Sequence, residues 1–293
     1  MAETVAPVVI ETSVATTDAA GSMLAVALTL PAERAGEAAA WEAALGSGAP
    51  VASGAPAVMV CHGLFGHKDN VFFRALGLAL ARKGLVALRI TCRGNRGSGG
   101  AWAMSGYADD VDDMLAVMAA TRAGLGLEFV ALIGHSRGGN SVVLAGADPR
   151  CPSSVVAVVA LAPRRLMPAI VPRYFTESQV AIIRAAGSLR WVPAFKPSVE
   201  VTITTQDLDT LLGLDMDAAY AALDSMSSRT VTVVHGDADA VIPVDDSASL
   251  PAAFPSVGFV CVPGADHLFT NTPDASDAVV TAAIDAVVAA SST

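Results

Sequence analysis

From residue 57 onward, short apolar runs alternate with segments of helical spacing, and this pattern limits the fold more than any other feature. Runs such as "AVMV" (57–60) and "EFVALI" (128–133) are rich in Val, Ile and Ala, without regular polar alternation. Strands buried on both faces have this composition, because helices cover both faces of a parallel sheet. The alternation therefore predicts an α/β fold with a mostly parallel, doubly wound sheet.

The expected elements follow one another along the whole chain. Residues 8–30 predict an N-terminal antiparallel hairpin with its turn at "TDAAGS" (17–22), and residues 32–45 predict a surface helix followed by a loop. Further strands are expected within residues 57–63, 85–94, 128–136, 154–163, 229–239 and 258–267, and most of these stretches end in polar residues or glycine. Helices are expected at 70–84, 107–124 (closed by Gly124), after residue 136, near 245–253 and at 274–290.

Residues 164–229 form a long interval between two of the expected core strands. Within it, Thr176 and Gln179 have the spacing of a capping box, which predicts a helix start. We expect a single domain over residues 1–293, with residues 164–229 inserted as a helical cap over the carboxyl edge of the sheet. The aromatic residues of the interval favour a small core of the cap, with an acyl pocket as the alternative: Tyr174, Phe175, Trp191 and Phe195.

Composition and charge exclude several classes of protein. The chain is 53% hydrophobic with a formal net charge of −10, which allows a large core and argues against nucleic-acid or anionic-membrane partners. The four cysteines have no CxxC spacing, so we expect reduced thiols, no zinc site and a cytoplasmic location. No Lys or Arg precedes Arg34 and no apolar stretch is long enough for a membrane span, so neither a targeting segment nor a span is expected.

The motif "GHSRGG" (134–139) follows an expected strand and precedes an expected helix. It has the form G-x-S-x-G, in which a serine at a tight strand-to-helix turn is exposed above the sheet. The helix N-terminus directs free N–H groups towards this serine. We predict that Ser136 is a nucleophile; the alternative is a serine that only caps the helix.

A serine nucleophile needs a base, and the base needs an acid that orients it. Among the five histidines, His267 follows the last expected strand and should lie at the same sheet edge as Ser136. His135 is expected to point away from the site. Asp237 and Asp239 follow the preceding strand, and either one satisfies the order Ser-Asp-His.

Two backbone N–H groups are candidates for an oxyanion hole. One belongs to Arg137, which follows the serine, and the other to Leu64 in the loop "HGLFG" (62–66). The cluster "ADDVDDM" (108–114) favours the start of a helix over a cation site. The loop "RGNRGSGG" (93–100) lacks phosphate-loop spacing and predicts a flexible loop near the active-site edge.

The motifs "HGLFG", "GHSRGG", "HGDADAVIP" (235–243) and "GADH" (264–267) together resemble the α/β-hydrolase superfamily. Within it, the chain is similar to the serine-aminopeptidase-like and feruloyl/cinnamoyl esterase-like branch. This resemblance implies an α/β-hydrolase fold and assigns the acid to Asp239, the second aspartate of H-G-x-x-D.

The motifs and the resemblance together predict a serine hydrolase that needs no cofactor or metal. We expect it to cleave small-molecule carboxylic esters through Ser136, His267 and Asp239, with the N–H groups of Leu64 and Arg137 at the oxyanion. One alternative is a peptidase of the aminopeptidase type. Another is a ligand-binding protein that retains the hydrolase pocket with little turnover. The sequence leaves the oligomeric state open.

Overall fold

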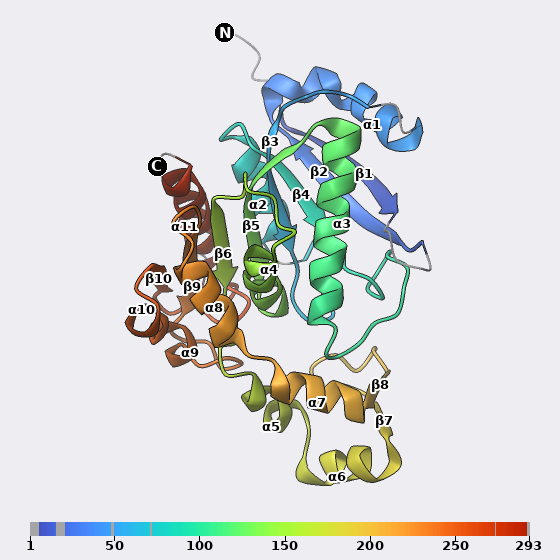
Figure 1. Cartoon of the computed structure of the whole chain (residues 1–293), viewed down its shortest axis with the longest axis vertical. Helices are drawn as coiled ribbons and strands as arrows, with labels where there is room; N and C mark the ends of the chain where they lie inside the picture. Colours follow the sequence, from blue (N-terminus) through green and yellow to red (C-terminus); the bar gives the residue numbers. More distant parts are fainter. Residues whose placement is uncertain (1–5, 16–20, 48–49, 71, 273, 292–293) are drawn as a thin grey trace.

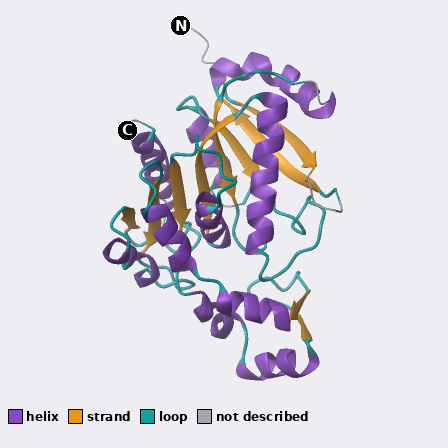
Figure 2. Ribbon diagram, in the orientation of Figure 1, coloured by secondary structure: helices purple, strands orange, loops and turns teal. Residues whose placement is uncertain are grey.

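An eight-stranded sheet forms the centre of the computed structural model, which describes residues 6–15, 21–47, 50–70, 72–272 and 274–291 (Figures 1 and 2). Its strands are β1 (Val8–Ala15), β2 (Met23–Leu30), β3 (Pro56–Cys61), β4 (Val86–Ile90), β5 (Glu128–His135), β6 (Ala157–Leu161), β9 (Thr230–Gly236) and β10 (Val257–Val262). Their order across the sheet is β1-β2-β4-β3-β5-β6-β9-β10.

The strand directions confirm the predicted fold class. The strands from β4 to β10 are parallel to their neighbours, whereas β1 pairs antiparallel with β2, and β2 with β4. The hairpin at the N-terminus is therefore present; most of its expected turn, residues 17–22, lies outside the described residues. Every residue of β4 and β6 is buried, which accounts for their continuous apolar sequence.

Helices cover the sheet on both faces (Figure 1). One face packs against α2 (Phe73–Ala81) and α11 (Ala275–Ala290). The helices of the other face are α1 (Ala38–Ser47), α3 (Tyr107–Leu125), α4 (Arg137–Ala147) and α8 (Met216–Asp224). Within the described residues, no helix has both the length and the apolar character needed to cross a membrane.

Three local predictions differ from the structure. The expected surface helix at 32–45 is a short 3-10 helix, η1 (Ala32–Glu37), followed by α1, and Trp41 of α1 is fully buried. Helix α3 continues past Gly124 and ends at Leu125, and its C-cap residue is Gly126, which has φ +64°. A left-handed C-cap favours glycine, and the sequence offers Gly124 and Gly126 two residues apart. In the structure Gly126 adopts the left-handed conformation, so the helix includes Gly124.

The expected helix near 245–253 is divided in two. The structure has α9 (Asp245–Ala248) and α10 (Leu250–Ala253), each a single short turn. Pro251 lies in the first turn of α10, where its missing N–H does no harm, but the same proline would remove a hydrogen bond from one continuous helix.

Most of the interval between β6 and β9 forms a projecting unit beyond the carboxyl edge of the sheet (Figure 1). The last helix of the interval, α8, packs instead against α4 and β9, so the projecting unit is shorter than the predicted cap at 164–229. The unit contains η2 (Met167–Ala169), α5 (Ile170–Tyr174), α6 (Glu177–Ala186), α7 (Thr205–Gly213) and the antiparallel pair β7 (Ser188–Trp191) and β8 (Val201–Thr204). The predicted capping box of Thr176 and Gln179 is present at the start of α6. The β7–β8 pair was not predicted.

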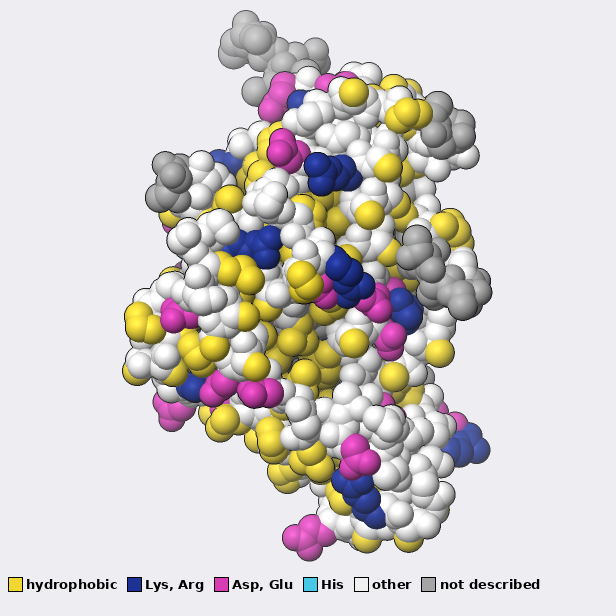
Figure 3. Space-filling model, in the orientation of Figure 1, with side chains coloured by type: hydrophobic (Ala, Val, Ile, Leu, Met, Phe, Trp, Pro, Cys, Tyr) yellow, Lys and Arg dark blue, Asp and Glu magenta, His cyan; other side chains and the backbone are white. Residues whose placement is uncertain are grey.

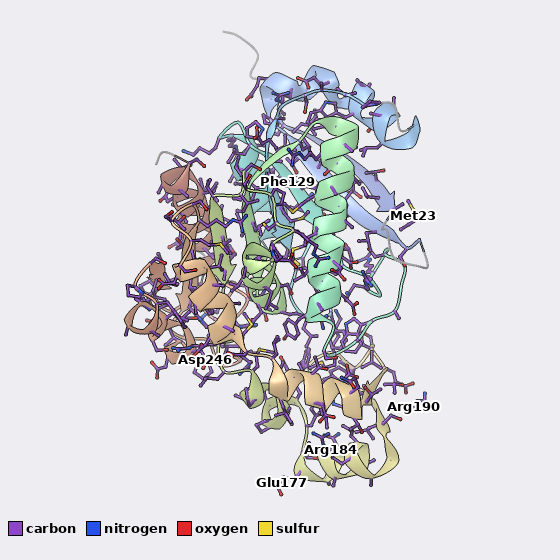
Figure 4. All side chains as sticks on the ribbon, in the orientation of Figure 1. Met23, Phe129, Glu177, Arg184, Arg190 and Asp246 are labelled. Carbon is purple, nitrogen blue, oxygen red and sulfur yellow. The ribbon has the colours of Figure 1, made fainter. Side chains whose placement is uncertain are left out.

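The surface of the projecting unit carries paired charges. Arg184 pairs with Asp209 and Arg190 with Glu200, and Figure 4 shows both arginines on this part of the molecule. Figure 3 shows hydrophobic side chains in the depression between this unit and the sheet. The surface of the unit also exposes apolar side chains, among them Ile182 and Leu212.

A buried ion pair joins α3 to α4 beneath the sheet edge. The guanidinium of Arg137 donates to Asp110 over 2.7 and 3.1 Å, and the two side chains are only 9% and 6% exposed. Arg137 also donates to the carbonyl oxygens of Ala103 and Met104, and Ser141 donates to Asp110. Each partner thus neutralises a charge that burial would otherwise make costly.

We predict that Arg137→Met lowers the free energy of unfolding by roughly 3–5 kcal/mol, because it leaves the Asp110 carboxylate buried without its partner. Urea denaturation followed by circular dichroism measures this. Arg150→Met is the matched control, since Arg150 pairs with Asp112 and Asp148 at the exposed surface and should have little effect. Equal losses in the two variants would contradict a special role for the buried pair.

Candidate active site

Ser136 lies at the sharp turn between β5 and α4. Its backbone has φ 55° and ψ −120°, a left-handed conformation that is strained for any residue other than glycine. The residue is half-buried, and its side chain lines a cavity at the carboxyl edge of the sheet. The strained turn therefore presents the hydroxyl to a space that a ligand can enter.

The turn requires a glycine two residues after the serine. A Cβ at Gly138 would lie 2.4 Å from the carbonyl oxygen of His62 and 2.5 Å from that of Cys61. Such a contact is far shorter than van der Waals distance, so any other residue would push α4 away from the end of β3. Gly138 thereby brings the loop after β3 against the start of α4.

Ser136, His267 and Asp239 form a hydrogen-bonded line. The Nε2 atom of His267 lies 2.9 Å from the Ser136 hydroxyl, and its Nδ1 atom lies 2.7 Å from Asp239 Oδ2. The loop after β10 supplies His267, and the loop after β9 supplies Asp239. The structure thus brings together the three side chains that the sequence singled out, although 131 residues separate the first from the last.

Asp237, the other candidate acid, lies apart from this line. It is exposed, and its carboxylate accepts a hydrogen bond from the backbone N–H of Gly264 over 2.6 Å. The contact ties two loops together at the surface. The geometry therefore favours Asp239 over Asp237 as the partner of His267.

Asp239 accepts four hydrogen bonds that hold it in one orientation. Oδ1 receives the backbone N–H groups of Val241 and Ile242, and Oδ2 receives His267 and a second imidazole, that of His235 at 3.0 Å. Burial alone would raise the pKa of Asp239, but the hydrogen bonds from His235 and His267 outweigh burial and hold the pKa well below its ordinary value. The carboxylate stays ionised beside His267.

His235 is a component of the site that the sequence reasoning did not assign. It is fully buried, and its Nδ1 atom lies 2.7 Å from the hydroxyl of Ser247. Its Nε2 atom faces two acceptors, Asp239 Oδ2 and the backbone carbonyl oxygen of Ile242 at 3.1 Å, so Nε2 carries a proton and donates it to Asp239. Its position four residues before Asp239, at the end of a strand, is the one sequence signal that could have indicated this role.

The expectation that His135 points away from the site is wrong. Its imidazole borders the cavity and donates from Nε2 to the backbone carbonyl of His267 over 2.7 Å. Phe72, Phe73 and Phe269 surround the ring. Burial, together with the nearby His267, lowers the pKa of His135 from 6.5 to about 3, so the ring is neutral and acts as a support for the His267 loop.

Leu64 and Arg137 place two unpaired N–H groups beside Ser136. Leu64 borders the main cavity and, together with Arg137, a small cavity on the other side of the serine. Among the described residues, neither N–H has a backbone hydrogen-bond partner. A Cβ built on Gly63, next to Leu64, would lie 3.2 Å from Ser136 Cβ, which shows how close this loop is to the serine.

The cavity above Ser136 has a volume of about 460 Å³, within the range of small-molecule sites. Its walls are mostly apolar, and the projecting unit contributes Tyr174 and Phe195 to them. Trp191 and Phe175 instead lie buried in the unit's own core. The four aromatic residues that the sequence analysis weighed as one group are thus divided between the two roles.

The aspartates of the acidic cluster at 108–114 form ion pairs with arginine side chains. Asp110 pairs with Arg137, and Asp109 and Asp113 pair with Arg93. No three potential metal ligands among His, Cys, Asp and Glu gather in the described parts of the chain.

A mostly parallel sheet with a serine at the strained turn after its central strand is the architecture of hydrolases that carry a nucleophile elbow. Residues 57–282 match the alpha/beta hydrolase family, so the chain belongs to that family. No curated protein matches the sequence.

Solved structures share the fold at low sequence identity. Est1E from Butyrivibrio proteoclasticus with ferulic acid bound is 20% identical, with a TM-score of 0.64 over 92% of this chain and 98% of its own. DcsB in complex with its substrate analogue is 15% identical, with a TM-score of 0.67 over 95% and 98%. The alpha/beta hydrolase GrgF from Penicillium sp. sh18 is 17% identical, with a TM-score of 0.65 over 96% and 98%.

We predict that His135 makes the protein less stable as the pH falls from about 6.5 toward 3. In this range the unfolded chain binds a proton at His135 that the folded chain does not, so the free energy of unfolding decreases by about 1.4 kcal/mol per pH unit from this group. Urea denaturation at pH 7, 6, 5 and 4 measures the effect. In His135→Gln, which has no titrating group but can still donate to the His267 carbonyl, this component should disappear; identical pH profiles would contradict the prediction.

Proposed function

We propose that this protein is a serine hydrolase that cleaves carboxylic esters with small to medium acyl groups. The observation that carries the proposal is the hydrogen-bonded line Ser136–His267–Asp239 at the floor of the apolar cavity. A nucleophile, a base and an orienting acid within hydrogen-bond reach are the requirements for acyl transfer through a covalent intermediate.

In the proposed first step, the Ser136 hydroxyl oxygen attacks the ester carbonyl carbon while His267 Nε2 takes its proton. Asp239 holds the His267 ring in the tautomer that has Nδ1 protonated, and its charge stabilises the imidazolium that forms. The carbonyl oxygen becomes an oxyanion between the N–H groups of Leu64 and Arg137. Collapse of this intermediate expels the alcohol, which receives the proton from His267.

In the proposed second step, water attacks the acyl-enzyme. His267 takes a proton from the water, and the same two N–H groups stabilise the second oxyanion. When the intermediate collapses, the proton returns to Ser136 and the carboxylic acid leaves. Within residues 164–229, the projecting unit ahead of α8 acts in this proposal as the cap that covers the cavity and shapes the acyl pocket through Tyr174 and Phe195.

Charge at the cavity favours an ester over a peptide with a free N-terminal amine. Arg173 and Lys196 both border the cavity, and their positive charge disfavours an ammonium group. Asp266 is the one acidic side chain among the described residues that border the cavity, and its carboxylate accepts hydrogen bonds from the backbone N–H and the hydroxyl of Thr270. These contacts support the esterase over the aminopeptidase alternative.

A fluorophosphonate probe followed by peptide mass spectrometry tests the proposed nucleophile. We expect covalent labelling at Ser136 and hydrolysis of 4-nitrophenyl butyrate, both lost in Ser136→Ala, with kcat reduced about 10⁶-fold. Ser225→Ala is the control, because Ser225 is exposed at the C-terminal end of α8, lines neither cavity beside Ser136, and donates from its hydroxyl to the Ala222 carbonyl. Labelling at another serine, or full turnover without Ser136, would overturn the proposal.

The two aspartates give a second, independent test. Asp239→Asn should lower kcat roughly 10⁴-fold, since an amide cannot hold His267 in the required tautomer. Asp237→Asn keeps the oxygen that accepts from Gly264 and should change kcat no more than a few-fold. The comparison uses steady-state kinetics with one ester. The opposite ranking would transfer the role of the acid to Asp237.

A further inference from the structure

A second groove opens beside the candidate active site, on the other side of Phe65. It has a volume of about 550 Å³ and shares Phe65, Asn70 and Lys196 with the cavity above Ser136. The ring of Phe65 stacks on Trp102, with centroids 4.7 Å apart. One ligand could therefore extend from the cavity into the groove along this aromatic pair.

The basic side chains at the two hollows differ from most of the others in the protein. Elsewhere most Lys and Arg side chains pair with carboxylates, as at Arg93, Arg137 and Arg165. Outside the two hollows, the basic side chains in the described parts of the chain that form no ion pair are Arg82, Lys83, Arg122, Arg164 and Arg229. Within the described residues, Arg96 in the groove, Arg173 at the cavity and Lys196 at both form no ion pair. In a chain with a net charge of −10, such unpaired cations at one place form a local site for an anion.

The groove also offers hydrogen-bond donors, one neutral and one charged. His67 Nδ1 accepts from the backbone N–H of Asp69, which leaves its ring proton on Nε2. Burial and the nearby Arg96 lower the pKa of His67, so it is a neutral donor at pH 7. Lys196 donates one hydrogen bond to the carbonyl oxygen of Phe65 over 2.5 Å and retains two further protons for a ligand.

The one carboxylate that lines the groove is already neutralised. Glu200 pairs with Arg190 of β7, and Figure 4 shows Arg190 at the side of the projecting unit. Arg96 and Lys196 therefore have no internal acid to satisfy them. An anion bound in the groove would give both side chains a negatively charged partner.

We propose that the substrate is an ester that carries a carboxylate, held by Arg96 and Lys196 in the groove while the ester group lies at Ser136. This inference rests on the proposed function and adds the charge of the substrate to it. The carboxylate belongs to either the acyl part or the alcohol part of the ester. The experiment below therefore has one arm for each part.

Each arm compares an anionic ester with a neutral ester of nearly the same shape. For the acyl part, the pair is the mono-4-nitrophenyl ester of adipic acid and the 4-nitrophenyl ester of adipic acid monoamide. For the alcohol part, it is the butyrate esters of 4-hydroxybenzoate and 4-hydroxybenzamide. We expect kcat/KM for the anionic member to exceed that for the neutral member about tenfold in one arm, the size that two exposed ion pairs provide. Added salt should reduce this ratio.

Substitutions then locate the effect. Arg96→Gln and Lys196→Gln should each lower the anionic-to-neutral ratio of kcat/KM, and the double variant should bring it close to one. Arg122→Gln is the matched control, because Arg122 is an exposed arginine without an ion pair in the last turn of α3, outside both hollows. This variant should retain the full ratio.

The outcomes separate this inference from the proposed function. Hydrolysis of the neutral and anionic esters at equal rates, or a ratio that both groove variants leave unchanged, overturns the anionic subsite and leaves the esterase intact. If no ester is hydrolysed, binding of uncleaved amides to the Ser136→Ala variant decides. The pairs are 4-butyramidobenzoate and 4-butyramidobenzamide for the alcohol part, and adipic acid monoanilide and its primary amide for the acyl part. Tighter binding of the anionic member of one pair, lost in the groove double variant, supports the subsite, and equal binding within both pairs overturns it.

Discussion

The contact of Gly138 with the carbonyl oxygens of Cys61 and His62 is the constraint on which the rest of the site depends. It permits α4 to begin directly against the end of β3, which forces the strained backbone of Ser136 and places Leu64 beside it. The strain of about 1–3 kcal/mol that such a residue stores is offset by the buried packing on both sides of the sheet. Without this close contact, neither the serine nor the two N–H groups would face the cavity.

Parallel strands explain why much of the site could be predicted from sequence. Ser136, Asp239 and His267 each follow an apolar run, and parallel strands end at one edge, so residues far apart in the chain meet there. The same runs predicted the fold class, because fully buried strands leave a continuous apolar signature. The choice of Asp239 over Asp237 came from the resemblance to a family, and the hydrogen-bond geometry favours the same choice.

The remaining features depend on contacts that have no local signature. Trp41 is buried because α1 packs against α3 and β1, which the alanine-rich sequence around it does not reveal. The β7–β8 pair involves strands of only four residues, too short for a recognisable alternation. His135 and His235 support the site through a backbone carbonyl and a carboxylate that only the folded chain brings near them.

The place where the projecting unit enters the sheet has an evolutionary consequence. Together with α8, it connects β6 to β9, two strands that pair directly with each other. The pairing of these strands therefore stays the same whatever segment connects them. Since doubling the length of a connection costs only about 0.6 kcal/mol in closure entropy, this segment can lengthen, shorten or diverge while the scaffold persists. New selectivity can therefore arise at the entrance by drift in one stretch of the gene, without any change to the strands that hold the reacting groups.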